Sequence, residues 1–178
     1  MRGIKTIESS SRYSGEVSLR IDRFVLAGKQ IKKEIVVHRD SVGILPIEQR
    51  SGGLVVTLVS QYRRAADAML LEIPAGKIEP GETPRQAAVR ELAEEVGCKP
   101  SILRPLLRCY LAPGYDTEFM TIFVARSLGK VPRGQLDEDE NISIKRLSFK
   151  SALRMCMSGE IIDCKTIAAL FAFAKTIR

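Results

Sequence analysis

The sequence predicts an α+β fold in which helices pack against a mixed β-sheet, with an antiparallel β-hairpin extension at the N-terminus. Three observations carry this prediction. Segments with strand-like patterns come first, one strongly capped helical stretch lies in the middle, and two helical stretches close the chain. With 178 residues and an apolar fraction of 45%, the chain has the size and composition of one globular domain.

The N-terminal part is expected to begin without regular structure. Residues 1–14 are polar, and we expect them to be an irregular segment before a single domain over residues 15–178. Apolar and polar side chains then alternate over residues 16–26, which predicts a half-buried strand. A turn at residues 27–29 and a second strand over residues 30–38 complete a predicted hairpin.

The main sheet is expected to come from five segments that are rich in apolar and β-branched residues. Two helices should follow it, one over residues 148–157 with Ser148 as its N-cap and one over residues 161–175 with broad apolar faces. The strands are predicted over residues 42–47, 54–60, 103–112, 119–125 and 141–147.

The central helix has clear start and stop signals. Thr83 is a predicted N-cap, Pro84 suits the first helical position, and Gln86 completes a capping box. Gly97 is a natural C-terminal residue for this helix, and a proline lies shortly after it. We therefore expect the helix to run from residue 83 to residue 97.

Three carboxylates gather on that helix. Glu91, Glu94 and Glu95 lie at positions i, i+3 and i+4, so they share one face. Grouped carboxylates repel one another unless a cation neutralises them, and a hard divalent cation with oxygen ligands does so. Arg90 can pair with Glu94 one turn further on. A solvated acidic face is the alternative, but the chain is otherwise basic and the helix follows a glycine-containing loop.

The composition excludes several classes of protein. No apolar run approaches membrane-spanning length, and the first residues lack a hydrophobic signal region, so we expect a soluble, cytoplasmic protein without a membrane partner. The four cysteines show no metal-type spacing and are expected to be reduced core thiols. A net charge of +7 permits nucleic-acid binding, but basic residues are spread along the chain and aromatics make up only 6%, so nucleic acid is not expected as a partner.

The spacing of the central stretch resembles a known signature. Glycine, five residues, glutamate, seven residues and then Arg-Glu-Leu-Ala-Glu-Glu-Val-Gly is similar to the Nudix box of Nudix hydrolases. Gly76, Glu82, Arg90 and Gly97 are its structural positions, and Cys98 departs from the usual aliphatic end. The resemblance implies an α/β/α sandwich. It also implies that Glu91, Glu94 and Glu95 hold Mg²⁺, with Mn²⁺ as the alternative, and that Glu91 and Glu95 take part in catalysis. We expect Glu82 to bond to the box backbone or to Arg90.

Two pieces before the box resemble the ADP-ribose pyrophosphatase branch of this family. They are Gln61-Tyr62-Arg63 and the stretch from Leu70 to Gly76, Leu-Leu-Glu-Ile-Pro-Ala-Gly. The resemblance implies that Arg63 reaches a phosphate of the substrate and that Glu72 lies beside the substrate. It also implies that Ala75 offers its backbone carbonyl to the metal ion.

Two loops after the box carry further implied site residues. The loop at residues 113–118 resembles the Ser-Pro-Gly loop of that branch, and Glu118 matches its acidic, substrate-side member. In relatives, a glutamate in the loop before the last strand is the catalytic base. The acidic run at residues 137–140 makes Glu140 the first candidate for this base and Glu138 the second.

The resemblance implies Mg²⁺-dependent hydrolysis of ADP-ribose to AMP and ribose 5-phosphate, or hydrolysis of a related nucleoside diphosphate sugar. Another nucleoside diphosphate derivative such as GDP-mannose is the main alternative, because the box contacts only the diphosphate. A non-catalytic nucleotide-binding module and an RNA-processing enzyme are further alternatives. The resemblance also implies a homodimer built through residues 15–40, and a simple edge hairpin is the other interpretation of these residues.

Overall fold

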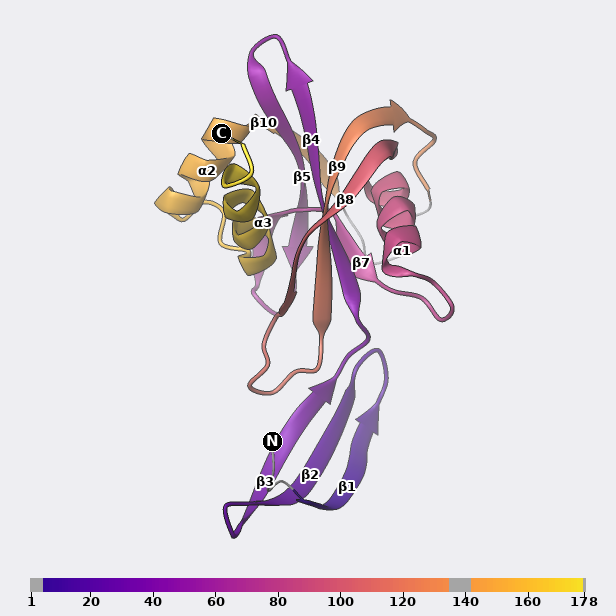
Figure 1. Ribbon diagram of the computed structural model, residues 1–178, viewed down its shortest axis with the longest axis vertical. Coiled ribbons are helices and arrows are strands. Elements are labelled where there is room, and N and C mark those ends of the chain that lie inside the picture. Colours follow the sequence, from indigo (N-terminus) through magenta and orange to yellow (C-terminus); the bar gives the residue numbers. More distant parts are fainter. Residues whose placement is uncertain (1–4, 135–141, 178) are drawn as a thin grey trace. The chain divides into compact units, whose positions relative to one another are not determined.

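The computed structural model describes residues 5–134 and 142–177 (Figure 1). The chain divides into two compact units. Unit 1 contains residues 1–40 and 110–119, and unit 2 contains residues 41–109 and 120–178. Each unit is described by itself.

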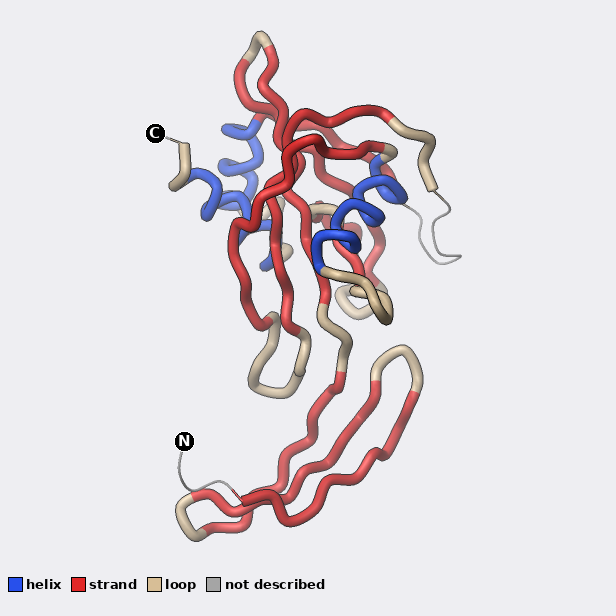
Figure 2. Tube along the Cα trace, turned by 45° about the vertical axis from the view of Figure 1, so that its right-hand side comes forward, coloured by secondary structure: helices blue, strands red, loops and turns tan. Residues whose placement is uncertain are grey.

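Unit 1 is built on a three-stranded antiparallel sheet (Figure 2). Its strands are β1 (Lys5–Ser14), β2 (Ser18–Leu26) and β3 (Lys29–Val37), in the order β1-β2-β3. The predicted hairpin corresponds to β2 and β3 and is confirmed. The expectation of an irregular segment over residues 1–14 is wrong, because Lys5–Ser14 forms a strand.

Strand β1 was not predicted because of the side chains that it carries. Nearly all of them are exposed, so the strand lacks the alternation of apolar and polar residues that marks a half-buried strand. Polar contacts to β2 hold it instead: Ser9 donates a hydrogen bond of 2.6 Å to Asp22, and Arg23 lies 2.7 Å from Glu8. The strand therefore depends on its neighbour and not on a core.

Unit 2 contains a mixed sheet, as predicted. Its main strands follow the order β10-β5-β4-β9-β8, and β4 runs parallel to β9 but antiparallel to β5. Two short strands were not predicted: β6 pairs with β5, and β7 pairs with β4. The strands are β4 (Ser41–Arg50), β5 (Gly53–Arg63), β6 (Ala68–Glu72), β7 (Ala75–Lys77), β8 (Cys98–Tyr110), β9 (Phe119–Lys130) and β10 (Ser143–Ser148).

Helices cover both faces of this sheet (Figure 1). Helix α1 (Pro84–Glu91) continues into a π-helical turn, η1 (Leu92–Val96), and lies on one face. Helices α2 (Phe149–Ser158) and α3 (Cys164–Ala174) lie on the other face. The α/β/α sandwich is thus confirmed. None of the helices within the described residues is long and apolar enough to cross a membrane.

The predicted ends of the central helix are confirmed. Thr83 caps it with the capping box to Gln86, and Pro84 occupies the first turn. Gly97 ends it with φ = 72° in the left-handed region. The π-helical turn in its second half was not predicted, and such turns occur often at functional sites.

The box helix is held to the sheet by a cluster of buried apolar side chains. Ala88, Leu92 and Val96 of the helix are buried, and Val89 is partly buried against the same cluster. Of the four thiols, Cys98 belongs to this core, whereas Cys164 is exposed. The prediction that all four cysteines are core thiols is therefore wrong for Cys164, which lies in the first turn of α3.

Substituting Gly97 tests the helix end. A Cβ at Gly97 would lie 3.2 Å from the Val131 carbonyl oxygen, and its φ is unfavourable for an L-residue. We expect Gly97→Ala to lower the free energy of unfolding by about 1–2 kcal/mol. Gly52→Ala is the control, because Gly52 has nothing within 4 Å of such a Cβ and no positive φ. Urea denaturation measures both, and an equal effect of the two substitutions would contradict the assignment.

Candidate active site

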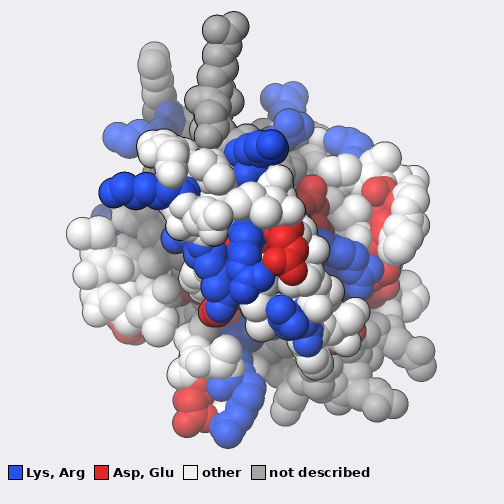
Figure 3. Space-filling view, turned by 90° about the horizontal axis from the view of Figure 1, so that it is seen from below, with Lys and Arg blue, Asp and Glu red and all other residues white. Residues whose placement is uncertain are grey.

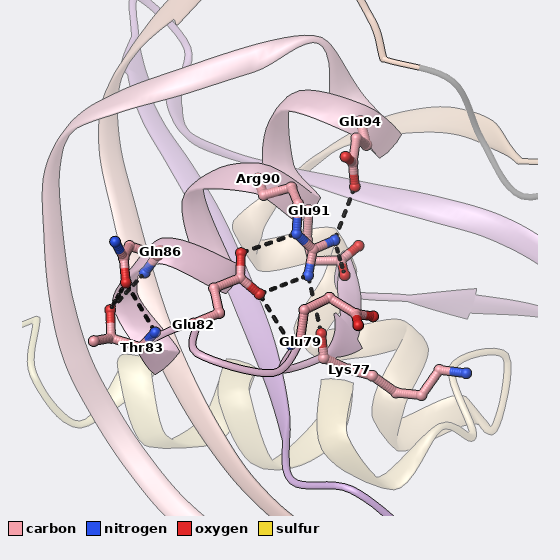
Figure 4. Close-up of polar contacts among 8 residues, drawn as sticks. All are labelled: Lys77, Glu79, Glu82, Thr83, Gln86, Arg90, Glu91 and Glu94. Atoms are coloured by element: carbon pink, nitrogen blue, oxygen red, sulfur yellow. Dashed lines mark hydrogen bonds and ion pairs between the residues drawn. The ribbon is translucent and has the colours of Figure 1, made fainter. Parts of the chain in front are cut away.

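The loop before α1 folds back on itself and delivers the first acidic residue. The Glu82 N–H donates to the Glu79 carbonyl oxygen over 2.9 Å, and the Glu79 N–H donates to the Glu82 carboxylate over 3.1 Å. Gly81, with φ = 83°, supplies the left-handed turn that this loop needs. The Glu82 carboxylate is thereby aimed at the first turns of the helix (Figure 4).

Arg90 is the centre of the polar contacts in this region (Figure 4). Its Nε and Nη2 donate to the two oxygens of Glu82, each over 3.0 Å. Its Nη1 donates to Glu91 Oε1 over 2.7 Å and to Glu94 Oε2 over 3.0 Å. Its Nη2 also donates to the Lys77 carbonyl oxygen over 3.0 Å. The predicted pairing of Arg90 with Glu94 is confirmed, as are both expected contacts of Glu82.

These contacts shift the titration of the groups involved. The hydrogen bond to Glu82, supported by those to Glu91 and Glu94, raises the pKa of Arg90 above its ordinary value in spite of partial burial. The hydrogen bond from Arg90 lowers the pKa of Glu82. Arg90 and Glu82 therefore stay charged at neutral pH, and one guanidinium bridges the loop and the helix.

Glycine allows two of the carboxylates to lie where they do. A Cβ at Gly76 would come within 2.0 Å of Glu91 Oε1, so a side chain at this position would displace the carboxylate. A Cβ at Gly134 would come within 2.7 Å of the Glu94 side chain. Arg133, next to Gly134, donates to the Glu94 carbonyl oxygen over 3.2 Å. Backbone of strand β7 and of the segment after β9 thus packs directly against the acidic face.

Glu91 and Glu95 are buried, whereas Glu94 is partly exposed. Glu95 lies in the π-helical turn. The hydrogen bonds that Arg63 donates to Glu72 do most to raise the pKa of Arg63, and the negative charge of Glu95 adds to this shift. The charge of Glu95 therefore reaches the end of β5, where Arg63 lies.

A second charge cluster surrounds Glu72, which is 1% exposed. Arg63 donates to both of its oxygens, through Nε and Nη2, each over 2.8 Å. Lys165 at the start of α3 donates to the same carboxylate and, over 2.9 Å, to Asp163. Burial alone would raise the pKa of Glu72, but the bond from Arg63 and the charge and bond of Lys165 outweigh it and hold this pKa below its ordinary value.

The donor set can be compared with the needs of a divalent cation. Oxygens of Glu91 and Glu94 already converge on one nitrogen of Arg90, and carboxylates are the hard ligands that Mg²⁺ takes. The Ala75 carbonyl belongs to the adjacent strand β7. Within residues 5–134 and 142–177, however, no three acidic, histidine or cysteine side chains are grouped closely enough to hold a metal as they stand. The donors fit the chemistry of Mg²⁺, and binding by three of them requires their side chains to come closer together.

The remaining predicted site residues are Glu118, Glu138 and Glu140. Glu118 belongs to unit 1, where its Oε2 lies 3.7 Å from His38 Nδ1. Glu138 and Glu140, the candidates for the catalytic base, fall outside the described residues. Lys165 and Asp163 were missed from the sequence, because a lysine and an aspartate near the start of a helix carry no motif.

The family can now be decided. The family model of the NUDIX domain matches residues 37–163. The chain belongs to the Nudix family. It is 34% identical over 169 residues to an ADP-ribose pyrophosphatase of Bacillus subtilis (strain 168), which covers 93% of this chain and 90% of that protein.

Two further similarities extend the comparison of this Nudix protein. It is 36% identical over 169 residues to a methanol dehydrogenase activator of Bacillus methanolicus, with the same coverage of 93% and 90%. The crystal structure of an ADP compounds hydrolase superposes with a TM-score of 0.87 and covers 99% of this chain and 95% of that one. At 23% identity, this last similarity shows the fold alone.

Removing the Glu72 carboxylate tests the second cluster. Because the folded state lowers the pKa of Glu72, its stabilising effect is present above the unfolded-state pKa of about 4.3 and is lost as the pH falls through the folded-state pKa. We expect Glu72→Gln to lower the free energy of unfolding by about 3 kcal/mol at pH 7, because it removes the carboxylate from Lys165, which is 11% exposed, while Arg63, which is 41% exposed, keeps access to water. Below the folded-state pKa of Glu72 the stabilities of the two proteins should approach each other.

The control for this prediction is Glu48→Gln. Glu48 pairs with the exposed Arg50, and loss of such a surface pair costs at most about 1 kcal/mol. Urea denaturation at a series of pH values measures all three proteins. A difference between wild type and Glu72→Gln that does not change with pH would contradict the charged state assigned to Glu72.

Proposed function

We propose that this Nudix protein hydrolyses the pyrophosphate bond of ADP-ribose, with a divalent metal, to AMP and ribose 5-phosphate. One observation carries the proposal: Glu91 and Glu94 both accept hydrogen bonds from Arg90. The backbone segment beside them begins at Glu72, which is bound by Arg63, and leads into the box. The similarity to the B. subtilis ADP-ribose pyrophosphatase supports this choice of substrate.

The chemistry follows from charge. A pyrophosphate repels an incoming nucleophile through its negative oxygens, so the site must supply positive charge. In the proposal, Glu91, Glu94, Glu95 and the Ala75 carbonyl hold Mg²⁺, or Mn²⁺. Such an ion neutralises phosphate charge and acidifies a bound water.

The remaining roles belong to side chains. Arg63 binds a phosphate through the exposed part of its guanidinium. Its side chain is 41% exposed, although it also donates two hydrogen bonds to Glu72. Glu140, or Glu138 as the second candidate, takes the proton of the attacking water. Arg90 and Glu82 keep the box loop and helix together. Glu118 is proposed as a substrate-side residue.

The second candidate is the same reaction on another nucleoside diphosphate sugar, such as GDP-mannose. The contacts proposed for Arg63 and the box are all to the diphosphate, so they do not select the base or the sugar. A non-catalytic module is disfavoured because Glu91, Glu94 and Glu95 are all present. RNA is disfavoured as a substrate because the basic residues are spread along the sequence and aromatic residues make up only 6% of it. Both basic and acidic side chains are visible in Figure 3.

A substrate panel tests the proposal. It contains ADP-ribose, ADP-glucose, GDP-mannose, NADH, diadenosine polyphosphates and 5′-triphosphate RNA, with Mg²⁺ and a phosphatase that releases phosphate from the products. We expect ADP-ribose to lead by tenfold or more, which corresponds to about 1.4 kcal/mol of discrimination. If another compound leads, the substrate is wrong but the reaction class stands. If nothing is hydrolysed, the proposed activity fails.

Glu95→Gln tests the role of the acidic face. We expect its turnover of ADP-ribose at saturating Mg²⁺ to fall by more than the roughly 10–100-fold that loss of an outer-shell partner costs. Glu160→Gln is the control, because Glu160 is exposed at the end of α2 and bonds only locally to Ser158. Wild-type turnover in Glu95→Gln would contradict the assigned role.

We also propose a homodimer formed through unit 1, with residues 15–40 as its central part. Large apolar side chains on its sheet are exposed, including Ile7 at 53% and Tyr13 at 60%. Light scattering should give twice the chain mass of 19.7 kDa, and Tyr13→Lys should shift the mass towards that of one chain. A single-chain mass for wild type at micromolar concentration would contradict this proposal.

A further inference from the structure

We propose that Asp163, Lys165 and Thr166, at the start of α3, are positioning residues for the phosphate-binding arginine and for the segment that leads into the box. This inference rests on the proposed function for the role of that arginine. The geometry that carries it consists of buried contacts that join residues 93 positions apart in the sequence.

The first contacts run through the backbone. Asp163 is the N-cap of α3, and its Oδ2 accepts from the Thr166 N–H over 3.0 Å and from Thr166 Oγ1 over 2.5 Å. The same Thr166 hydroxyl oxygen accepts from the Ile73 N–H over 2.7 Å. Thr166 is fully buried, so no water can easily replace it. The helix cap is thereby attached to the backbone just before the box.

The second contacts run through charge. Lys165 donates to the other oxygen of Asp163 and to the Glu72 carboxylate, and Glu72 in turn receives both hydrogen bonds of Arg63. The side chain of Lys165 is 11% exposed and that of Glu72 is 1% exposed. A buried carboxylate and a nearly buried ammonium hold a defined geometry when each is paired. The orientation of Arg63 therefore depends on Lys165 through Glu72.

The residues after Ile73 are also held by backbone hydrogen bonds. A displacement of Ile73 would therefore reach the box. The Pro74 carbonyl oxygen accepts from the Ile44 N–H over 2.8 Å. Ala75 and Gly76 pair with Gly43 and Val42 in the ladder between β7 and β4. Helix α3 thus anchors the first two residues of a segment that the sheet holds from Pro74 onward. A misplacement of about 1 Å in such a segment can cost 10²-fold in rate.

A simple capping role would not explain these contacts. Thr83 caps α1 and Ser148 caps α2 through hydroxyl groups that bond within their own helix turn. Asp163 instead uses one oxygen for the cap and the other for Lys165. The cap of α3 therefore has a second partner that leads to Arg63.

The kinetic test compares Lys165→Met with Lys165→Arg and with Lys175→Met, a control at the exposed C-terminal end of the same helix. We expect Lys165→Met to lower kcat/KM for ADP-ribose by about 10–100-fold. It should also weaken the binding of ADP-ribose in EDTA, measured by calorimetry, by a similar factor. Lys165→Arg should restore part of both losses, and Lys175→Met should match wild type. A change below twofold in Lys165→Met would overturn the proposal.

A double-mutant cycle with Arg63→Gln separates positioning from general stability. If Lys165 acts through Arg63, Lys165→Met should cost much less in the Arg63→Gln background than in wild type. Equal losses in both backgrounds would overturn the proposal. Where Lys165→Met fails to fold, Asp163→Asn serves instead, because asparagine still caps the helix but removes the charge that faces Lys165.

Hydrogen exchange gives a readout that does not depend on catalysis. Lys165→Met should speed exchange in the peptide from Glu72 to Lys77, and Lys175→Met should leave that peptide unchanged. Unchanged exchange in Lys165→Met would overturn the anchoring role. If wild type hydrolyses no compound in the substrate panel, the proposed function fails, and the exchange result still decides whether α3 holds this segment.

Discussion

Repulsion between carboxylates is the constraint on which this structure depends. Glu82, Glu91 and Glu94 all contact a single guanidinium, that of Arg90, so one positive charge holds a loop and two helical turns together. A second, steric constraint explains two glycines at this face. Backbone can approach the acidic face only at positions without a side chain, as at Gly76 and Gly134. Arg90 also bonds to the Lys77 carbonyl oxygen, which ties the face to strand β7.

The second charge cluster, around Glu72, is also held by ion pairs, but its carboxylate is more deeply buried. Glu72 stays ionised although it is buried, because Arg63 and Lys165 both bond to it. The two clusters lie at the two ends of one short segment: Glu72 begins it, and Gly76 ends it against Glu91. This arrangement connects the helices on opposite faces of the sheet, since α1 carries Glu91 and α3 carries Lys165.

The parts of this structure that were predictable are those with local causes. The capping box at Thr83, the left-handed Gly97 and the pairing of Arg90 with Glu94 each involve residues within a few positions of one another. The box motif also revealed the family. Strand β1 was not predictable, because its exposed polar side chains carry no alternation and only its pairing with β2 makes it a strand. Lys165 was not predictable either, because its partner Glu72 is far away in the sequence and meets it only in the folded chain.

The proposed function depends on the binding of a divalent cation by the acidic face of the box helix. A titration of the protein with Mn²⁺, followed by the electron paramagnetic resonance signal of the free ion, tests it most directly. We expect wild type to remove free Mn²⁺ from solution. We expect that a folded variant with glutamine at positions 91, 94 and 95 does not. Equal binding by both proteins would contradict the account, because the metal would then lie elsewhere.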